Sequence, residues 1–157
     1  MQLTLYTDYS LRVLIYLGIR PQYQATITEI AESYNISRNH LVKVVHNLGS
    51  LGYITTVRGR GGGMLLAHAP EDINIGEVVR KTEPNFDLVE CFDKENNTCP
   101  ISPCCALIKG LKVARRAFLD VLDGFTLADA VANREELAGF LDIDRTSLES
   151  GPPCQRS

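Results

Sequence analysis

The sequence has no tryptophan and no long hydrophobic run. No stretch approaches the roughly 18 consecutive apolar residues of a transmembrane helix, so we expect no membrane partner. Its start, MQLTLYTDYS, lacks the basic and apolar segments of a secretory signal. These absences predict a cytoplasmic protein whose thiols stay reduced.

Enzyme motifs are missing as well. The chain has no acid–base pair in a recognisable motif, no phosphate-binding glycine loop before a helix and no nucleophile signature. We therefore expect no catalytic residues and a protein that is not an enzyme. The cysteine count of 5 is odd, which argues against a disulfide framework. Metal binding or redox chemistry is the better use of clustered thiols.

Charge is distributed unevenly along the 157 residues, although the net charge is only -3. The first 68 residues are basic, and most of the acidic side chains follow later. The charged residues of this first part are Arg12, Arg20, Arg38, Lys43, Arg58 and Arg60 against Asp8, Glu29 and Glu32. DNA binding needs a local basic surface and not a high overall pI, so this part is the candidate DNA-binding region.

The N-terminal region has the pattern of a helix-turn-helix. A first helix is expected over residues 7–19, and Thr26 to Glu29 fits a capping box that opens a second. Ser37 is a suitable N-cap for a third helix. Its apolar residues follow the i, i+3, i+4, i+7 spacing of a buried stripe: Leu41, Val44, Val45 and Leu48. In such a motif this last helix enters the major groove.

A β-hairpin is expected next, with strands over residues 53–57 and 64–67 and the loop Arg58-Gly-Arg-Gly-Gly-Gly63. Glycines allow a close approach to a phosphate chain, and the arginines supply charge. The alternative is an ordinary flexible hairpin tip, but its place directly behind a helix-turn-helix favours a wing. For Arg38, Asn39, His40 and Lys43 of the third helix, the alternative to DNA contact is an ordinary solvent-exposed helix face. The candidate DNA contacts are Ser37, Arg38, Asn39, His40, Lys43, Arg58 and Arg60.

Residues 84–105 form a polar loop with few candidates for a hydrophobic core, and it contains Cys91, Cys99, Cys104 and Cys105. A bound metal would order such a loop. Structural zinc usually has paired Cys-x2–4-Cys units, which this spacing lacks unless Cys104 is used. An iron–sulfur cluster accepts thiolates spread along a loop. The spacing leaves iron–sulfur and zinc open, and unligated thiols are a third possibility.

Beyond the loop, an apolar seam at spacings of four and three predicts a long helix. The seam consists of Leu107, Leu111, Ala114, Phe118, Val121 and Phe125. It covers about two and a half heptads, so a helix packed on its own domain is the alternative to a dimerisation helix. Dimerisation is favoured because helix-turn-helix proteins normally read paired half-sites.

The sequence therefore predicts a mainly α fold with a small β-wing, a winged helix-turn-helix followed by a long dimerisation helix. Its parts are a DNA-binding domain over residues 1–83, ending in a helix at 74–83, and a cluster-binding loop over 84–105. The dimerisation helix and a short C-terminal helix from Thr126 occupy 106–141. Residues 142–157 are expected to be a disordered tail, so Cys154 is not a candidate ligand.

Four segments together resemble the NsrR family of nitric-oxide-sensing repressors. They are Leu3-Thr-Leu-Tyr-Thr-Asp8-Tyr, Ser37-Arg-Asn-His-Leu-Val-Lys43, Val57-Arg-Gly-Arg-Gly-Gly-Gly63 and the loop of Cys91, Cys99 and Cys105. The resemblance covers about residues 1–135. This family lies in the winged-helix superfamily that also contains the iron–sulfur-cluster regulator IscR.

The resemblance implies a homodimeric repressor that binds a double-stranded, palindromic DNA operator and responds to nitric oxide. It also implies an iron–sulfur cluster in each subunit, held by Cys91, Cys99 and Cys105, with 4Fe-4S favoured over 2Fe-2S. Asp8 would supply a fourth ligand from the partner subunit; its alternative is an i,i+4 ion pair with Arg12. Cys104 is then a spare thiol.

Two other kinds of regulator in this superfamily fit the sequence less well. IscR uses a histidine three residues after its third cysteine, where this chain has Ile108. Regulators of cysteine metabolism in the superfamily lack the cysteine set, so both differences favour the nitric-oxide sensor. The alternatives are a zinc-stabilised winged-helix module that senses nothing, or a related iron–sulfur regulator of redox or cluster status.

Overall fold

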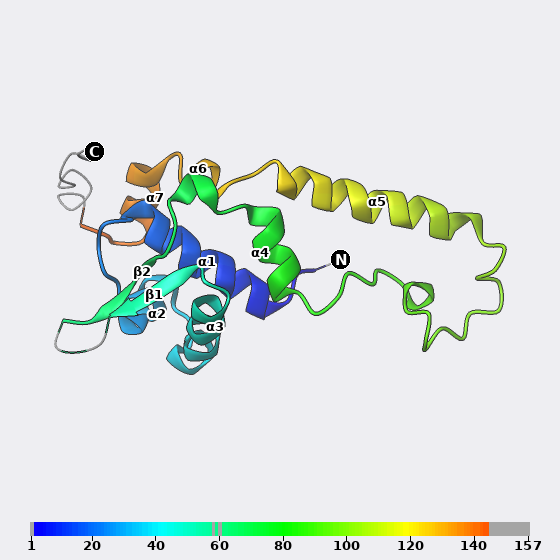
Figure 1. Cartoon of the computed structure of the whole chain (residues 1–157), viewed down its shortest axis with the longest axis horizontal. Coiled ribbons are helices and arrows are strands. Elements are labelled where there is room, and N and C mark those ends of the chain that lie inside the picture. The colour runs from blue at the N-terminus through cyan, green and yellow to red at the C-terminus, as the bar shows by residue number, and fades with distance from the viewer. Residues whose placement is uncertain (1, 58, 60, 145–157) are drawn as a thin grey trace.

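The computed structural model describes residues 2–57, 59 and 61–144. Helices dominate, with one two-stranded antiparallel sheet, as the sequence predicted (Figure 1). The elements in chain order are α1 Leu5–Ile19, α2 Ile27–Tyr34, α3 Arg38–Ser50, β1 Ile54–Val57, β2 Gly63–Leu66, the 3-10 turn Pro70–Asp72, α4 Ile75–Thr82, the 3-10 turn Glu90–Phe92, α5 Ala106–Asp123, α6 Leu127–Ala130 and α7 Arg134–Phe140. Up to residue 144, two short helices thus follow α5 where the sequence predicted one.

The ends of the helix-turn-helix elements follow from local hydrogen bonds. The predicted capping box is present: the Thr26 hydroxyl accepts from the Glu29 N–H at 3.2 Å, and the Glu29 carboxylate accepts from the Thr26 N–H at 2.6 Å. Asn35 ends α2 in the left-handed conformation at φ 52°. Ser37 holds the N-cap position of α3, but its hydroxyl makes no cap hydrogen bond.

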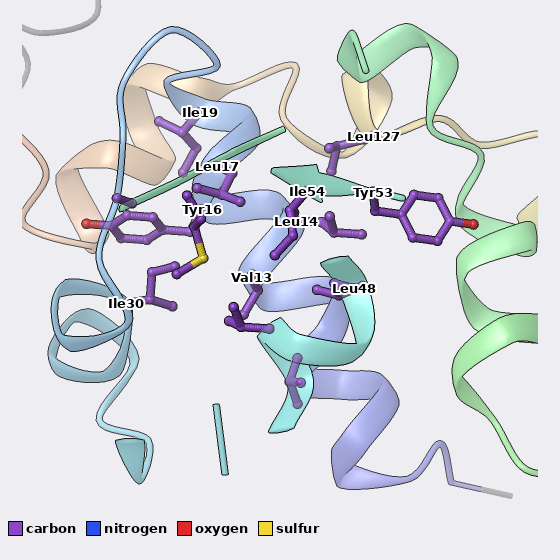
Figure 2. Close-up of a cluster of buried hydrophobic side chains, with 14 of the residues drawn as sticks. Val13, Leu14, Tyr16, Leu17, Ile19, Ile30, Leu48, Tyr53, Ile54 and Leu127 are labelled. Atoms are coloured by element: carbon purple, nitrogen blue, oxygen red, sulfur yellow. The ribbon is translucent and has the colours of Figure 1, made fainter. Parts of the chain in front are cut away.

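The core is built around α1, which runs through the middle of the compact part of the molecule (Figures 1 and 2). The predicted stripe of α3 is buried, with Leu41 and Leu48 fully covered. Leu127 of α6 is also fully buried and packs against Gly18 of α1. Ile143 is a core residue too, which places residues 142–144 on the domain and not in the tail predicted from the sequence. Residues 145–157 lie outside the described residues.

The hairpin is anchored to the helix-turn-helix by its second strand. Ile54 pairs with Leu66 and Val57 with Gly63, so both strands lie within a residue of the predicted ranges. Ala25, just before α2, exchanges two backbone hydrogen bonds with Met64 at 2.8 and 3.0 Å. A Cβ on Gly63 would come within 2.8 Å of the Ala25 carbonyl oxygen, so this contact requires glycine. Arg58 and Arg60 lie outside the described residues.

Helix α5 projects away from the compact part and is attached through its C-terminal end (Figure 1). There Asp123 forms an ion pair with Arg80 of α4, and its carbonyl accepts from the Asn74 amide at 2.7 Å. None of its 18 residues is buried. In the described part of the chain no helix is long and apolar enough to cross a membrane.

The burial of the Tyr34 phenol makes the stability of the fold depend on pH. Burial raises the pKa of Tyr34 to about 12, against an opposing effect of Arg12. A raised pKa favours the folded state below pH 10 and loses that contribution as pH rises toward 12. We expect the free energy of unfolding, measured by urea titration, to fall over this range and to fall less in Tyr34→Phe. An equal slope in Tyr34→Phe would contradict this; the exposed Tyr23→Phe is the control.

Candidate DNA interface and metal centre

The exposed face of α3 carries the predicted DNA contacts. Arg38, Asn39 and Lys43 are all exposed, opposite the buried stripe. Val42 and His46 lie on the same exposed face. Neither was among the DNA contacts predicted from the sequence, although helical periodicity places both opposite the buried stripe and could have identified them. A valine on this face can contact a thymine methyl group, and a histidine can hydrogen bond to bases or phosphate.

His40 has a partner inside the protein. Its ring stacks on Tyr9 of α1, with ring centroids 6.3 Å apart and an interplanar angle of 27°. The residue before Tyr9 is Asp8, whose carboxylate pairs with Arg12 at 2.8 Å. The Arg12 guanidinium also lies 5.9 Å from the Tyr9 ring centroid and 5.7 Å from that of Tyr34. A continuous set of contacts therefore joins Asp8 to the DNA-facing helix.

The start of α1 is also tied to the start of the cysteine loop. Thr4 caps α1, and the carboxylate of Glu83 accepts from its N–H at 2.6 Å and from its hydroxyl at 3.1 Å. Glu83 is the residue after α4, immediately before the loop. Within one subunit, the start of the helix that carries Asp8 therefore lies beside the start of the loop that carries the cysteines.

The loop over residues 84–105 contains no buried side chain. Short polar contacts shape it instead. Asn97 accepts from the Cys99 N–H at 3.1 Å, and Glu90 accepts from the backbone and hydroxyl of Thr98. The hydrogen bonds from Thr98 lower the pKa of Glu90, and that from Asn96 lowers the pKa of Asp93. These are local turns, which order short segments without a hydrophobic core.

The thiols of Cys91, Cys99 and Cys105 are half-buried, and that of Cys104 is exposed. Cys105 stands at the N-cap of α5, while Cys104 donates to the Ile101 carbonyl at 3.5 Å. Across residues 2–57, 59 and 61–144, no three His, Cys, Asp or Glu side chains are grouped closely enough to hold a metal ion. The structure thus places the three thiols in one loop but groups them neither with one another nor with Asp8 as ligands of a metal ion.

The chemistry of these donors nevertheless fits a soft metal centre. Thiolates are the ligands of iron–sulfur clusters and of zinc, and three of them share a loop that lacks a core of its own. The Asp8 side chain is 38% exposed at the surface of α1, so its carboxylate is accessible to another group. The observed pair with Arg12 is the alternative expected for Asp8 from the sequence.

Comparison with known proteins gives a consistent assignment. The family model of Rrf2, described as iron-dependent transcriptional regulator, matches residues 3–133. The HTH-type transcriptional regulator NsrR of Bacillus subtilis is 58% identical over 144 residues, covering 91% of this chain and 99% of that protein. NsrR of Shouchella clausii is 50% identical over 147 residues, covering 93% and 99%.

A solved structure agrees in fold. T. potens IscR superposes with a TM-score of 0.68 at 24% identity, covering 87% of this chain and 90% of that one. This confirms the winged-helix fold class predicted from the sequence, and the relatives confirm a role in transcription. The chain belongs to the Rrf2 family of winged-helix transcriptional regulators.

Proposed function

We propose that this DNA-binding regulator is a repressor whose operator affinity is controlled by an iron–sulfur cluster that reacts with nitric oxide. The observation that carries the proposal is the loop of Cys91, Cys99 and Cys105, which lacks a core and begins beside the first helix of a DNA-binding head. The similarity to NsrR proteins over most of the chain supports the same function.

Cys91, Cys99 and Cys105 would hold the cluster, and Asp8 of the partner subunit would be its fourth ligand. A bound 4Fe-4S cluster supplies iron that nitric oxide binds strongly. In this structure one oxygen of the Asp8 carboxylate pairs with Arg12 at 2.8 Å. Ligation of a cluster in the partner subunit would draw the carboxylate away from Arg12, so the observed pair would be the arrangement of α1 in the absence of the cluster.

A change at Asp8 would be transmitted to the recognition helix α3 through a short series of side-chain contacts. Arg12 contacts the Tyr9 ring, and Tyr9 stacks on His40 in α3. Breaking or forming the Asp8–Arg12 pair therefore changes the support of the helix that enters the major groove. A small rotation of α3 matters because the two recognition helices of a dimer must be separated by roughly 34–36 Å, one turn of DNA.

The dimer would form through the exposed seam of α5. A two-fold dimer presents two equivalent recognition helices, so its operator should be palindromic. If Asp8 binds the cluster of the other subunit, it links the two chains as well as the head and the loop. Loss of that link would disturb both the dimer geometry and α3.

The first test is the iron, acid-labile sulfide and zinc content of protein purified without oxygen. About four iron and four sulfide per subunit would support the proposal, and about two of each would change only the cluster type. Stoichiometric zinc without sulfide would overturn it in favour of a structural zinc module. Nitric oxide should then release the loaded protein from its operator at constant salt, and unaffected binding would also overturn the proposal.

The arginines of the hairpin tip should contribute to phosphate contacts. In the double variant Arg58→Ala, Arg60→Ala we expect weaker DNA binding and a flatter plot of log K against log salt. Each lost phosphate contact lowers the slope by about 0.9. Fluorescence anisotropy at several salt concentrations measures this. Arg116→Ala, which removes an exposed arginine from α5, is the control, and an unchanged slope in the double variant would exclude the wing from phosphate binding.

A further inference from the structure

One side chain of α5 fastens the cysteine loop to the helix that follows it. Arg115 is half-buried, and its guanidinium contacts three loop residues. Its Nη1 donates to the Phe86 carbonyl at 3.4 Å and lies 3.7 Å from the Asp87 carboxylate. Its Cζ lies 4.7 Å from the centroid of the Phe92 ring.

These contacts matter because the loop has no buried residue of its own. Phe86 and Asp87 lie at its start, and Phe92 directly follows Cys91. Arg115 therefore holds the first part of the loop, residues 86–92, against helix α5, which follows the loop. The segment between Phe92 and Arg115 contains Cys99 and Cys105, so its ends are already joined before any ligand binds. Closing a flexible loop costs entropy, and a contact that closes it in advance lowers the cost of bringing the thiols together.

We propose that Arg115 is a positioning residue for the metal centre: it holds the cysteine loop in place so that Cys91, Cys99 and Cys105 can converge on one cluster. The proposal rests on the proposed function for the identity of the bound group. Arginine suits the role because its planar guanidinium can stack on an aromatic ring and donate in its plane at the same time. Lysine keeps the charge but not this geometry.

The next residue of the helix provides a matched control. Arg116 has the same charge and lies on the same helix, but its side chain is 85% exposed, and among the described residues it pairs only with Asp120, one turn further along α5. Arg116→Ala therefore removes an equal charge without releasing the loop. Neither residue belongs to the buried core of the winged helix, so both variants should fold.

The first experiment needs no bound cluster. Lys94 is exposed within the loop, and trypsin cleavage after it reports how often this segment leaves α5. In the metal-free full chain we expect cleavage after Lys94 to be severalfold faster in Arg115→Ala than in the wild type. Arg116→Ala should match the wild type, and Arg115→Lys should lie in between. Equal rates in Arg115→Ala and Arg116→Ala would overturn the proposal.

The second experiment uses the loaded protein and follows the loss of cluster absorbance in the presence of a chelator. Arg115→Ala should lose the cluster several times faster than Arg116→Ala, with partial rescue in Arg115→Lys. Equal loss from the two alanine variants would contradict the proposal. If the wild type and Arg116→Ala contain no iron and sulfide at all, the proposed function fails, and the cleavage rates after Lys94 still decide whether Arg115 holds the loop.

Discussion

Replacing Cys99 with alanine is expected to abolish iron and sulfide loading and tight operator binding together. Cys99 lies in the middle of the loop, where Asn97 accepts from its N–H and its carbonyl accepts from Ser102. Its thiol packs into no hydrophobic core, so the change should leave the stability of the winged helix within about 0.5 kcal/mol. The variant thus removes a ligand and leaves the DNA-facing surface intact.

The expected loss of affinity is large because specific DNA binding exceeds non-specific binding by about 4–10 kcal/mol. A protein that keeps only its charge contacts should therefore bind its operator about 1,000-fold more weakly or worse. Iron and sulfide analysis measures loading, and fluorescence anisotropy at fixed salt measures binding. Tight, nitric-oxide-sensitive binding by Cys99→Ala would disprove the proposed function.

Cys104→Ala is the matched control for this experiment. Cys104 lies in the same loop and has an exposed thiol, but it is not among the proposed ligands. It should load the cluster and bind the operator as the wild type does. Cys105→Ala should behave like Cys99→Ala. If instead Cys104→Ala lost the cluster and Cys105→Ala kept it, the third thiolate ligand would be Cys104, and the cluster proposal itself would stand.

The sequence predicted the winged-helix head well because its signals are local. The apolar stripe of α3 and the capping box at Thr26 depend on residues three or four positions apart, and both are present. The first helix was placed two residues too late, since Thr4 and not a later residue caps it. Ile143 was missed because one apolar residue among polar neighbours has no periodicity.

The site was less predictable because its contacts are between distant residues. The stacking of Tyr9 on His40, the bond from Thr4 to Glu83 and the contact of Arg115 with Phe92 each depend on the tertiary fold. No spacing rule indicates them. The cysteines could be selected from the sequence, but the way they converge depends on the bound group and on the partner subunit. The position of Asp8 beside Arg12 was predicted only as one of two alternatives.

Introducing a charge at Val121 is expected to break the dimer. Val121 lies in the predicted seam of α5, and its side chain is 64% exposed in the single chain. In a two-fold dimer it would be buried against the partner helix, where an unpaired carboxylate costs several kcal/mol. Val121→Glu should therefore be monomeric at concentrations where the wild type is a dimer, as measured by analytical ultracentrifugation.

The control for this change lies on the same helix. Val113 is 69% exposed, so it matches Val121 in type and accessibility, but it falls outside the seam. Helical geometry places it about a third of a turn or more away from Leu107, Leu111 and Phe118. Val113→Glu should remain dimeric. If both variants stayed dimeric, or both dissociated, the seam would not be the interface.

DNA binding should follow the oligomeric state. When one DNA-binding head of a dimer is bound to a palindromic operator, the second head is held at a high local concentration near its half-site. This raises the overall affinity by about 10²–10⁴. Val121→Glu should lose about this factor on the full operator and almost nothing on a single half-site. Val113→Glu should keep both affinities. A monomeric Val121→Glu that bound the full operator as tightly as the wild type would show that each subunit reads its site alone, and the link between α5 and repression would have to be abandoned.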